Sequence, residues 1–151
     1  MKKLAIAMMM AMASVVCVAA DAKDAKPAKT DTAEAKEKVE ARCRRVIKNA
    51  ISLFEQGEDD RAVGMLEAIG RMYPDAEERF GANLELGRHF LDKRDFDRAG
   101  AELRKAQRSA KEDVRTEALL LQGQLHNSRG ESSEAMMVLR RLTQDYPTSR
   151  F

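Results

Sequence analysis

The feature that most constrains the fold is a short motif that occurs three times at nearly constant spacing. Its first copy, Gly57 to Pro74, has the pattern of a tight turn, a short amphipathic helix and a proline stop. The same design returns around residues 94–106 and 130–147. Equivalent alanines follow one another at intervals of 37 and 36 residues: Ala62, Ala99 and Ala135. Such periodic self-similarity is typical of stacked repeat proteins, so a repeated scaffold is predicted.

Apolar residues recur at helical spacing, and no stretch alternates with a period of two for long enough to form a strand. We therefore predict an all-α fold. The first helix is expected over about 35–56 and ends at Gly57, where a left-handed backbone costs glycine little. Asp59 or Asp60 is expected to cap the second helix, which Pro74 closes.

The second and third helix pairs follow the same scheme, starting near residues 75–76 and 112–113. The corner at Arg94 has no glycine, so it is less sharply specified than the corner at Gly130. Gly87 costs about 1 kcal/mol relative to alanine inside a helix. The expected compensation is close approach of the partner helix at Ala99.

Small residues stand twelve positions before each repeated alanine, and prolines close two of the pairs. This pattern resembles the tetratricopeptide repeat over about 42–147, which implies a right-handed superhelix of three antiparallel helix pairs at 42–75, 79–111 and 115–148. The chain departs from the pattern at Arg94, where glycine is usual, and at Lys111, where a proline is usual. The residues assigned to repeat packing are Ala50, Ala62, Gly87, Ala99, Gly123, Ala135, Pro74 and Pro147.

Residues 1–20 have the three parts of a secretory signal peptide: two lysines, an apolar run and small residues before Asp21. Cleavage after Ala20 and a periplasmic or secreted location are predicted. Two alternatives remain, an uncleaved membrane anchor and a lipid on Cys17. The apolar run is shorter than the roughly 20 residues that span a bilayer, and Val16 stands where lipidation prefers a small residue.

Residues 21–34 are rich in Ala, Lys and Asp and contain no large apolar residue, so a flexible linker is predicted before the repeat domain at 35–151. Removing Lys2 and Lys3 with the signal leaves 27 − 2 = 25 basic residues against 25 acidic ones, because residues 1–20 contain no acid. A nucleic-acid partner is therefore not expected.

The potentially reactive side chains form no pattern of a catalytic site. Cys43 is expected to be buried in the first helix, with a bridge to another molecule as the alternative. His126 is expected in the core and His89 toward solvent. Neither has a Cys, His or carboxylate at metal-ligand spacing that outweighs chance in a chain that is one-third charged, and there is no Gly-rich phosphate loop. We predict no enzyme activity, no cofactor, no metal and no small-molecule substrate.

Two repeat junctions carry a narrower likeness. Tyr73 to Ala76 and Tyr146 to Phe151 look like junctions of exported bacterial tetratricopeptide proteins. Examples of these are the periplasmic coordinator of the Tol-Pal system and the lipoprotein of the outer-membrane β-barrel assembly machine. This resemblance implies a protein-binding scaffold of the bacterial cell envelope with protein partners there.

The resemblance also implies that the first helices of successive pairs line a concave groove for a partner segment. The alternative is that Ile47, Ile51 and Leu84 pack within this helix layer or under the N-terminal linker. The repeat register gives these groove candidates: Arg44, Ile47, Ile51, Phe54, Leu84, Arg88, Leu91, Glu117, Leu120, Gln124 and Asn127.

The last helix has apolar residues and no element after it to cover them. A terminal repeat normally needs a polar outer face or a capping helix. Met136, Met137, Leu139 and Leu142 are therefore expected to have an exposed edge. The alternative function is a self-assembling envelope component that forms homo-oligomers through this end, with Cys43 as a further link.

Overall fold

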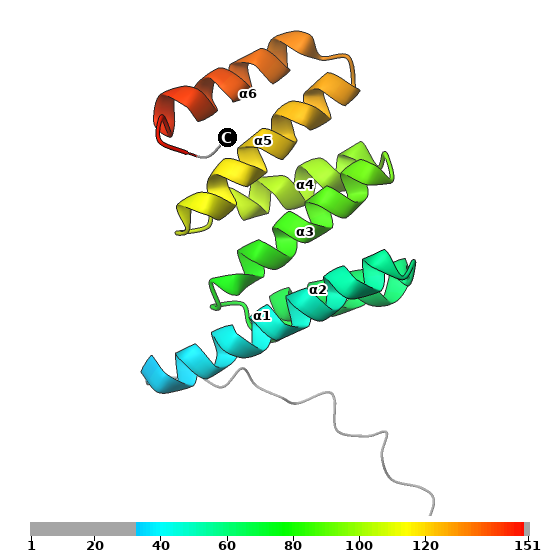
Figure 1. Cartoon of the computed structure of the whole chain (residues 1–151), viewed down its shortest axis with the longest axis vertical. Coiled ribbons are helices and arrows are strands. Elements are labelled where there is room, and N and C mark those ends of the chain that lie inside the picture. Colours follow the sequence, from blue (N-terminus) through cyan, green and yellow to red (C-terminus); the bar gives the residue numbers. More distant parts are fainter. Residues whose placement is uncertain (1–32, 150–151) are drawn as a thin grey trace, which may run out of the picture.

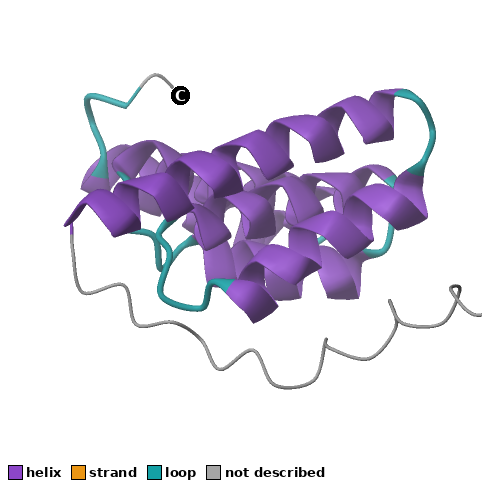
Figure 2. Cartoon of the chain, turned by 90° about the horizontal axis from the view of Figure 1, so that it is seen from below, coloured by secondary structure: helices purple, strands orange, loops and turns teal. Residues whose placement is uncertain are grey.

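The computed structural model describes residues 33–149, and this part of the chain contains only helices and loops (Figure 2). The predicted signal peptide lies outside the described residues, as does the predicted linker up to residue 32. Residues 33–34, which were also assigned to the linker, instead begin the first helix. The helices are α1 (Ala33–Glu55), α2 (Asp59–Met72), α3 (Glu78–Asp92), α4 (Phe96–Ala106), α5 (Glu112–Ser128) and α6 (Ser132–Asp145).

The six helices form three antiparallel pairs that stack along the long axis of the molecule (Figure 1). Helix α3 contacts α1 and α2 on one side and α4 and α5 on the other. Helix α6, by contrast, contacts only α5 among the described helices. The predicted all-α solenoid of three helix pairs is confirmed.

The three corners within the pairs share one backbone geometry. A residue with positive φ follows each first helix: Gly57 at 77°, Arg94 at 61° and Gly130 at 78°. In every corner this residue donates to the carbonyl three positions back, and the next N–H donates five positions back. These are the two hydrogen bonds of the Schellman motif. Arg94 therefore adopts the conformation that glycine provides at the other corners.

The starts of two helices differ from the sequence prediction. Helix α2 begins at Asp59 without a side-chain cap, so the prediction that Asp59 or Asp60 caps it was wrong. The Asp59 carboxylate instead forms an ion pair with Lys93 at 2.6 Å. Helix α3 begins at Glu78, two to three residues later than expected, because a turn after Tyr73 occupies the intervening residues.

The pairs are held together internally by small residues at helix crossings. Ala50, Ala62, Ala99 and Ala135 are buried, whereas Pro74 and Pro147 are exposed in the turns. A Cβ on Gly87 would lie 2.7 Å from Leu103 Cδ2. The nearest side chain is thus Leu103, one turn beyond the expected Ala99. Gly123 has the equivalent relationship to Leu139, at 2.8 Å.

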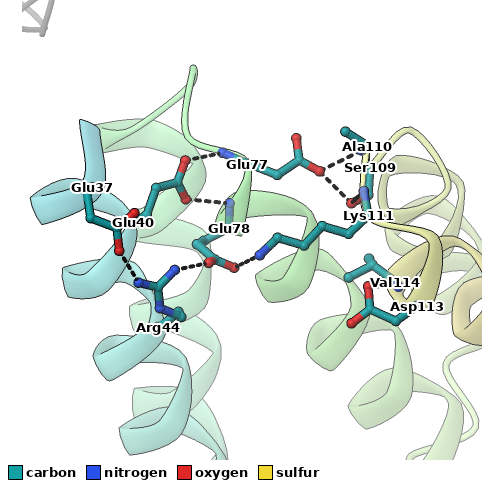
Figure 3. A network of polar contacts seen from close by, with 10 residues as sticks. All are labelled: Glu37, Glu40, Arg44, Glu77, Glu78, Ser109, Ala110, Lys111, Asp113 and Val114. Atoms are coloured by element: carbon teal, nitrogen blue, oxygen red, sulfur yellow. Dashed lines mark hydrogen bonds and ion pairs between the residues drawn. The ribbon is translucent and has the colours of Figure 1, made fainter. Parts of the chain in front are cut away.

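A buried carboxylate joins the first pair to the second (Figure 3). Glu40 of α1 is only 7% exposed. Its Oε1 accepts a hydrogen bond from the Glu77 N–H at 2.9 Å, and its Oε2 accepts one from the Glu78 N–H at 3.0 Å. Because the first N–H groups of a helix have no intrahelical acceptor, Glu40 satisfies the start of α3 from another repeat.

The two glutamates that begin α3 extend the network to the third pair. Glu78 accepts from Arg44 of α1 at 2.7 Å and from Lys111 at 2.9 Å (Figure 3). Glu77 accepts from the Ser109 hydroxyl and from the Ala110 N–H in the turn before α5. One end of α3 thus fixes the spacing of all three pairs.

Candidate protein-binding surfaces

The apolar groove candidates of α1 and α3 largely pack against their neighbours. Leu84 lies in the core at 5% exposure, so it is not available to a partner. Ile47 Cδ1 lies 3.6 Å from the Cβ position of Gly81 on α3. Phe54 stacks on His89, with ring centroids 4.2 Å apart. For Ile47 and Leu84, the structure thus shows the packing that was the alternative to a groove contact.

The charged groove candidates form ion pairs between helix pairs. Arg44 pairs with Glu37 and Glu78, and Arg88 with Glu117 of α5. Arg88 Nε also lies 3.4 Å from Glu85 Oε2. Burial raises the pKa of Glu85, while Arg88 acts in the opposite direction. These charges therefore serve contacts within the stack.

The remaining candidates divide between two places. Ile51 and Leu91 are half-buried on α1 and α3. Leu120, Gln124 and Asn127 lie together at the other end of the array, where α5 and α6 enclose a hollow of about 280 Å³. We call it the C-terminal hollow, and its lining residues are Leu120, Gly123, Gln124, Asn127, Ser132, Ala135, Met136 and Leu139.

Large apolar side chains are exposed at the C-terminal hollow. Met136 is 62% exposed and Leu139 is 38% exposed, and Met137 is exposed on the same helix. The expected exposed edge of α6 is confirmed for these three residues. It was wrong for Leu142, which is buried because it faces the packed side of α6.

The repeat register explains why this surface is open. Gly100 on α4 stands 36 residues before Met136, and its Cβ position lies 3.6 Å from Leu125 Cδ1 of the following helix. In the first pair, Ile47 is the register counterpart of Leu120, and it lies against Gly81 of α3. The C-terminal hollow is thus the surface that a further helix covers in the two earlier pairs. The predicted groove candidates lie on α1, α3 and α5 and include no residue of α6, although Met136 and Leu139 of α6 line the same hollow as Leu120, Gln124 and Asn127.

The cysteine and histidines are engaged in packing. Cys43 is fully buried, and this burial raises the pKa of its thiol. The alternative of an intermolecular bridge at Cys43 is inconsistent with this burial. His89 was expected to face solvent, but it stacks on Phe54. His126 is largely covered, and its Nδ1 lies 2.6 Å from Glu131 Oε2.

Two further searches concern only residues 33–149. They contain no cluster of three or more His, Cys, Asp or Glu that could hold a metal ion. None of the helices in this range combines the length and apolar character needed to cross a membrane.

Helix pairs that stack so that each contacts only its neighbours define the class of helical-repeat scaffolds. The tetratricopeptide repeat model matches residues 47–114 and 84–150, more than half of the chain. The chain belongs to the tetratricopeptide repeat family, whose fold is typically a non-enzymatic scaffold for protein–protein interaction. No curated protein and no solved structure gives a significant match.

Proposed function

We propose that this protein is an exported adaptor of the cell envelope that binds an amphipathic helix of a partner protein in the C-terminal hollow. The observation that carries the proposal is the uncovered apolar surface of Met136 and Leu139. By contrast, the register counterparts of Leu139, which are Leu66 and Leu103, are buried, and the counterpart of Met136, Gly100, lies against α5. Exposed apolar patches with a polar rim are characteristic of interaction sites. Gln124, Asn127 and Ser132 supply that rim.

A helix is the occupant that suits the shape of this surface. Both equivalent surfaces in the array are covered by amphipathic helices that place small or apolar residues against them, such as Gly81 and Leu125. Helix-in-groove recognition uses the same contacts between chains. The envelope placement is supported by the signal-like residues 1–20 and by the resemblance of the repeat junctions to exported proteins.

Head-to-tail stacking of copies is disfavoured by the composition of α1. The repeat register aligns Gly81, Glu85 and His89 of α3 with three exposed polar residues of α1: Arg44, Lys48 and Ser52. This face of α1 would bring two basic side chains against the apolar hollow, at a cost in desolvation. A second candidate function is two-fold pairing of two C-terminal hollows, which brings Met136 and Leu139 of each copy together.

Site-specific crosslinking in the native envelope tests the proposal. A photoreactive residue replaces Met136 in one variant and Met72 in another, since both are exposed methionines and only Met136 lines the hollow. We expect one recurring envelope protein to be joined at position 136 and not at position 72. Crosslinks only between copies at position 136 support two-fold pairing, and equal yields at both positions contradict a specific site.

Sedimentation at several concentrations separates the two candidates further. The adaptor is expected to remain monomeric, whereas two-fold pairing gives a concentration-dependent dimer. In the latter case Met136→Glu returns the protein to a monomer, because a charge cannot be buried unpaired in an apolar interface.

A further inference from the structure

A second hollow, of about 440 Å³, lies between α2 and α4. These two helices do not contact each other, and α3 lies between them as the floor. The volume falls within the range of about 300–1,000 Å³ that is usual for ligand pockets. We call it the α2–α4 groove, and its lining residues are Leu66, Glu67, Gly70, Arg71, Arg79, Phe80, Asn83, Leu86, Glu102, Lys105 and Arg108.

The charges of this groove are unbalanced. Four of its lining residues are basic and two are acidic. The two acids are already paired, Glu67 with Arg71 at 3.5 Å and Glu102 with Lys105 at 2.7 Å.

Two arginines of the groove have no carboxylate partner within residues 33–149. Arg79 lies over the Phe80 ring, 4.5 Å from its centroid, and Arg108 follows the end of α4. Neither forms an ion pair with a described residue. Arg44 and Arg88, on the α1–α3–α5 side, both form ion pairs with carboxylates of other repeats. The α2–α4 groove therefore offers guanidinium groups that the fold itself does not use.

The floor between these arginines adds one polar group. Asn83 is half-buried there, and its side-chain amide makes no hydrogen bond to another described residue. An amide can both donate to a carbonyl and accept from an N–H, so it can bind the backbone of an extended peptide. Leu66, Phe80 and Leu86 form the buried apolar base beneath it.

We propose that the α2–α4 groove binds an acidic peptide segment of a partner protein, with carboxylates on Arg79 and Arg108 and peptide backbone on Asn83. Guanidinium groups bind carboxylates through paired N–H donors, which gives orientation as well as attraction. The segment differs from the partner helix of the C-terminal hollow, because it is recognised by charge and not by apolar area. The two sites lie on different helices, so both can be filled together.

The composition of the groove favours an acidic protein segment over nucleic acid or the chain's own N-terminal part. Glu67 and Glu102 interrupt the basic side chains, so the groove offers no continuous basic row for successive phosphates. Nucleic-acid sites normally show a longer basic face. Residues 21–32 of this chain carry three lysines and three aspartates, so they have no net negative charge to offer.

Fluorescence anisotropy with the full chain tests the proposal. The probe is a fluorescein-labelled twelve-residue peptide of alternating glutamate and alanine, and the same peptide with glutamine is the neutral control. Arg79→Ala/Arg108→Ala is compared with Arg42→Ala/Arg45→Ala, which removes two exposed arginines of α1 that also lack described ion pairs. We expect the groove variant to weaken binding about tenfold or more and the control to change it less than about twofold.

Each other result overturns the proposal. An equal loss of peptide affinity in both double variants would show general charge attraction. Equal affinity for the neutral peptide would show that the groove does not recognise the negative charge. Stronger binding of a single-stranded DNA oligonucleotide than of the acidic peptide would assign the groove to nucleic acid. Circular dichroism checks folding of each variant, and shifts of the Asn83 side-chain amide resonances in the unmodified protein locate the probe independently.

Discussion

Gly87 lies so close to Leu103 that no side-chain carbon fits between them: a Cβ would stand 2.7 Å from Leu103 Cδ2 and 2.8 Å from its Cγ. Leu103 is fully buried and cannot move aside. Gly87→Ala is therefore expected to lower the free energy of unfolding by about 1–3 kcal/mol, as overpacking does. Urea denaturation at constant m-value measures the change.

Other glycines provide the controls for this substitution. Gly64 in α2 has no atom within 4 Å of its Cβ position, so Gly64→Ala should raise stability by about 0.5–1 kcal/mol through helix propensity. Gly123→Ala should cost less than Gly87→Ala, because the neighbouring Leu139 is partly exposed and can turn away. Equal effects at positions 64 and 87 would contradict the close helix crossing.

Arg94→Gly is expected to stabilise the protein by about 1 kcal/mol. Arg94 has a φ of 61°, and the left-handed conformation is strained for residues with a side chain. Arg94→Ala is the matched control, since alanine removes the exposed side chain but keeps the strain. Thermal unfolding measures both variants, and an equal rise in Tm for glycine and alanine would contradict the backbone explanation.

Protonation of His89 is expected to destabilise the fold. Burial lowers the pKa of His89, while Asp59 and Asp92 act in the opposite direction and Lys93 and Arg98 add to the lowering. The unfolded chain therefore binds the proton more readily. The stabilisation from neutral His89 is complete above the ordinary histidine pKa of about 6.5. It is lost as the pH falls through the lower pKa of His89 in the folded state.

His89→Phe isolates this contribution, because phenylalanine can keep the stack on Phe54 and has no proton to gain. We expect the free energy of unfolding of the parent protein to fall more between pH 8 and pH 5 than that of His89→Phe. Urea denaturation at each pH makes the comparison. Parallel pH profiles would show that His89 titrates alike in both states.

Glu40→Ala is expected to lower stability by about 1–3 kcal/mol, because it leaves the Glu77 and Glu78 N–H groups without their acceptor. Hydrogen exchange should show faster exchange at these two amides. Glu34→Ala, which removes an exposed pair with Lys38, is the control and should change stability by less than about 0.5 kcal/mol. Unchanged protection at position 78 would contradict the role of Glu40.

Local sequence signals were sufficient for the helix pairs and their corners. A glycine such as Gly57 or Gly130 marks a left-handed backbone at a helix end, and the apolar period gives the helix before it. The start of α3 could not be read in this way. Its first amides bond to Glu40, which is 37 and 38 residues away in the sequence, so no neighbouring residue signals the position.

The sequence predicted the lining of the C-terminal hollow only for residues whose exposure follows from their position in the repeat. Leu120, Gln124 and Asn127 line the C-terminal hollow, and register had assigned them to a binding surface. Arg44 and Arg88 were assigned there too, but each pairs with a glutamate 34 or 29 residues distant. Charged residues on a solvent-facing helix look alike in the sequence whether their partner is another protein or a neighbouring repeat.

Because α6 packs on one side only, we expect it to unfold locally before the other helices of the array. Since α6 contacts α5 alone among the helices of residues 33–149, its detachment requires less free energy than separating α3, which has neighbours on both sides. The final turns of the chain should therefore exchange their amide protons first. A helix bound across α5 and α6 would slow this exchange. Partner binding would therefore be detected as slower amide exchange in α6, even if the average position of α6 did not change.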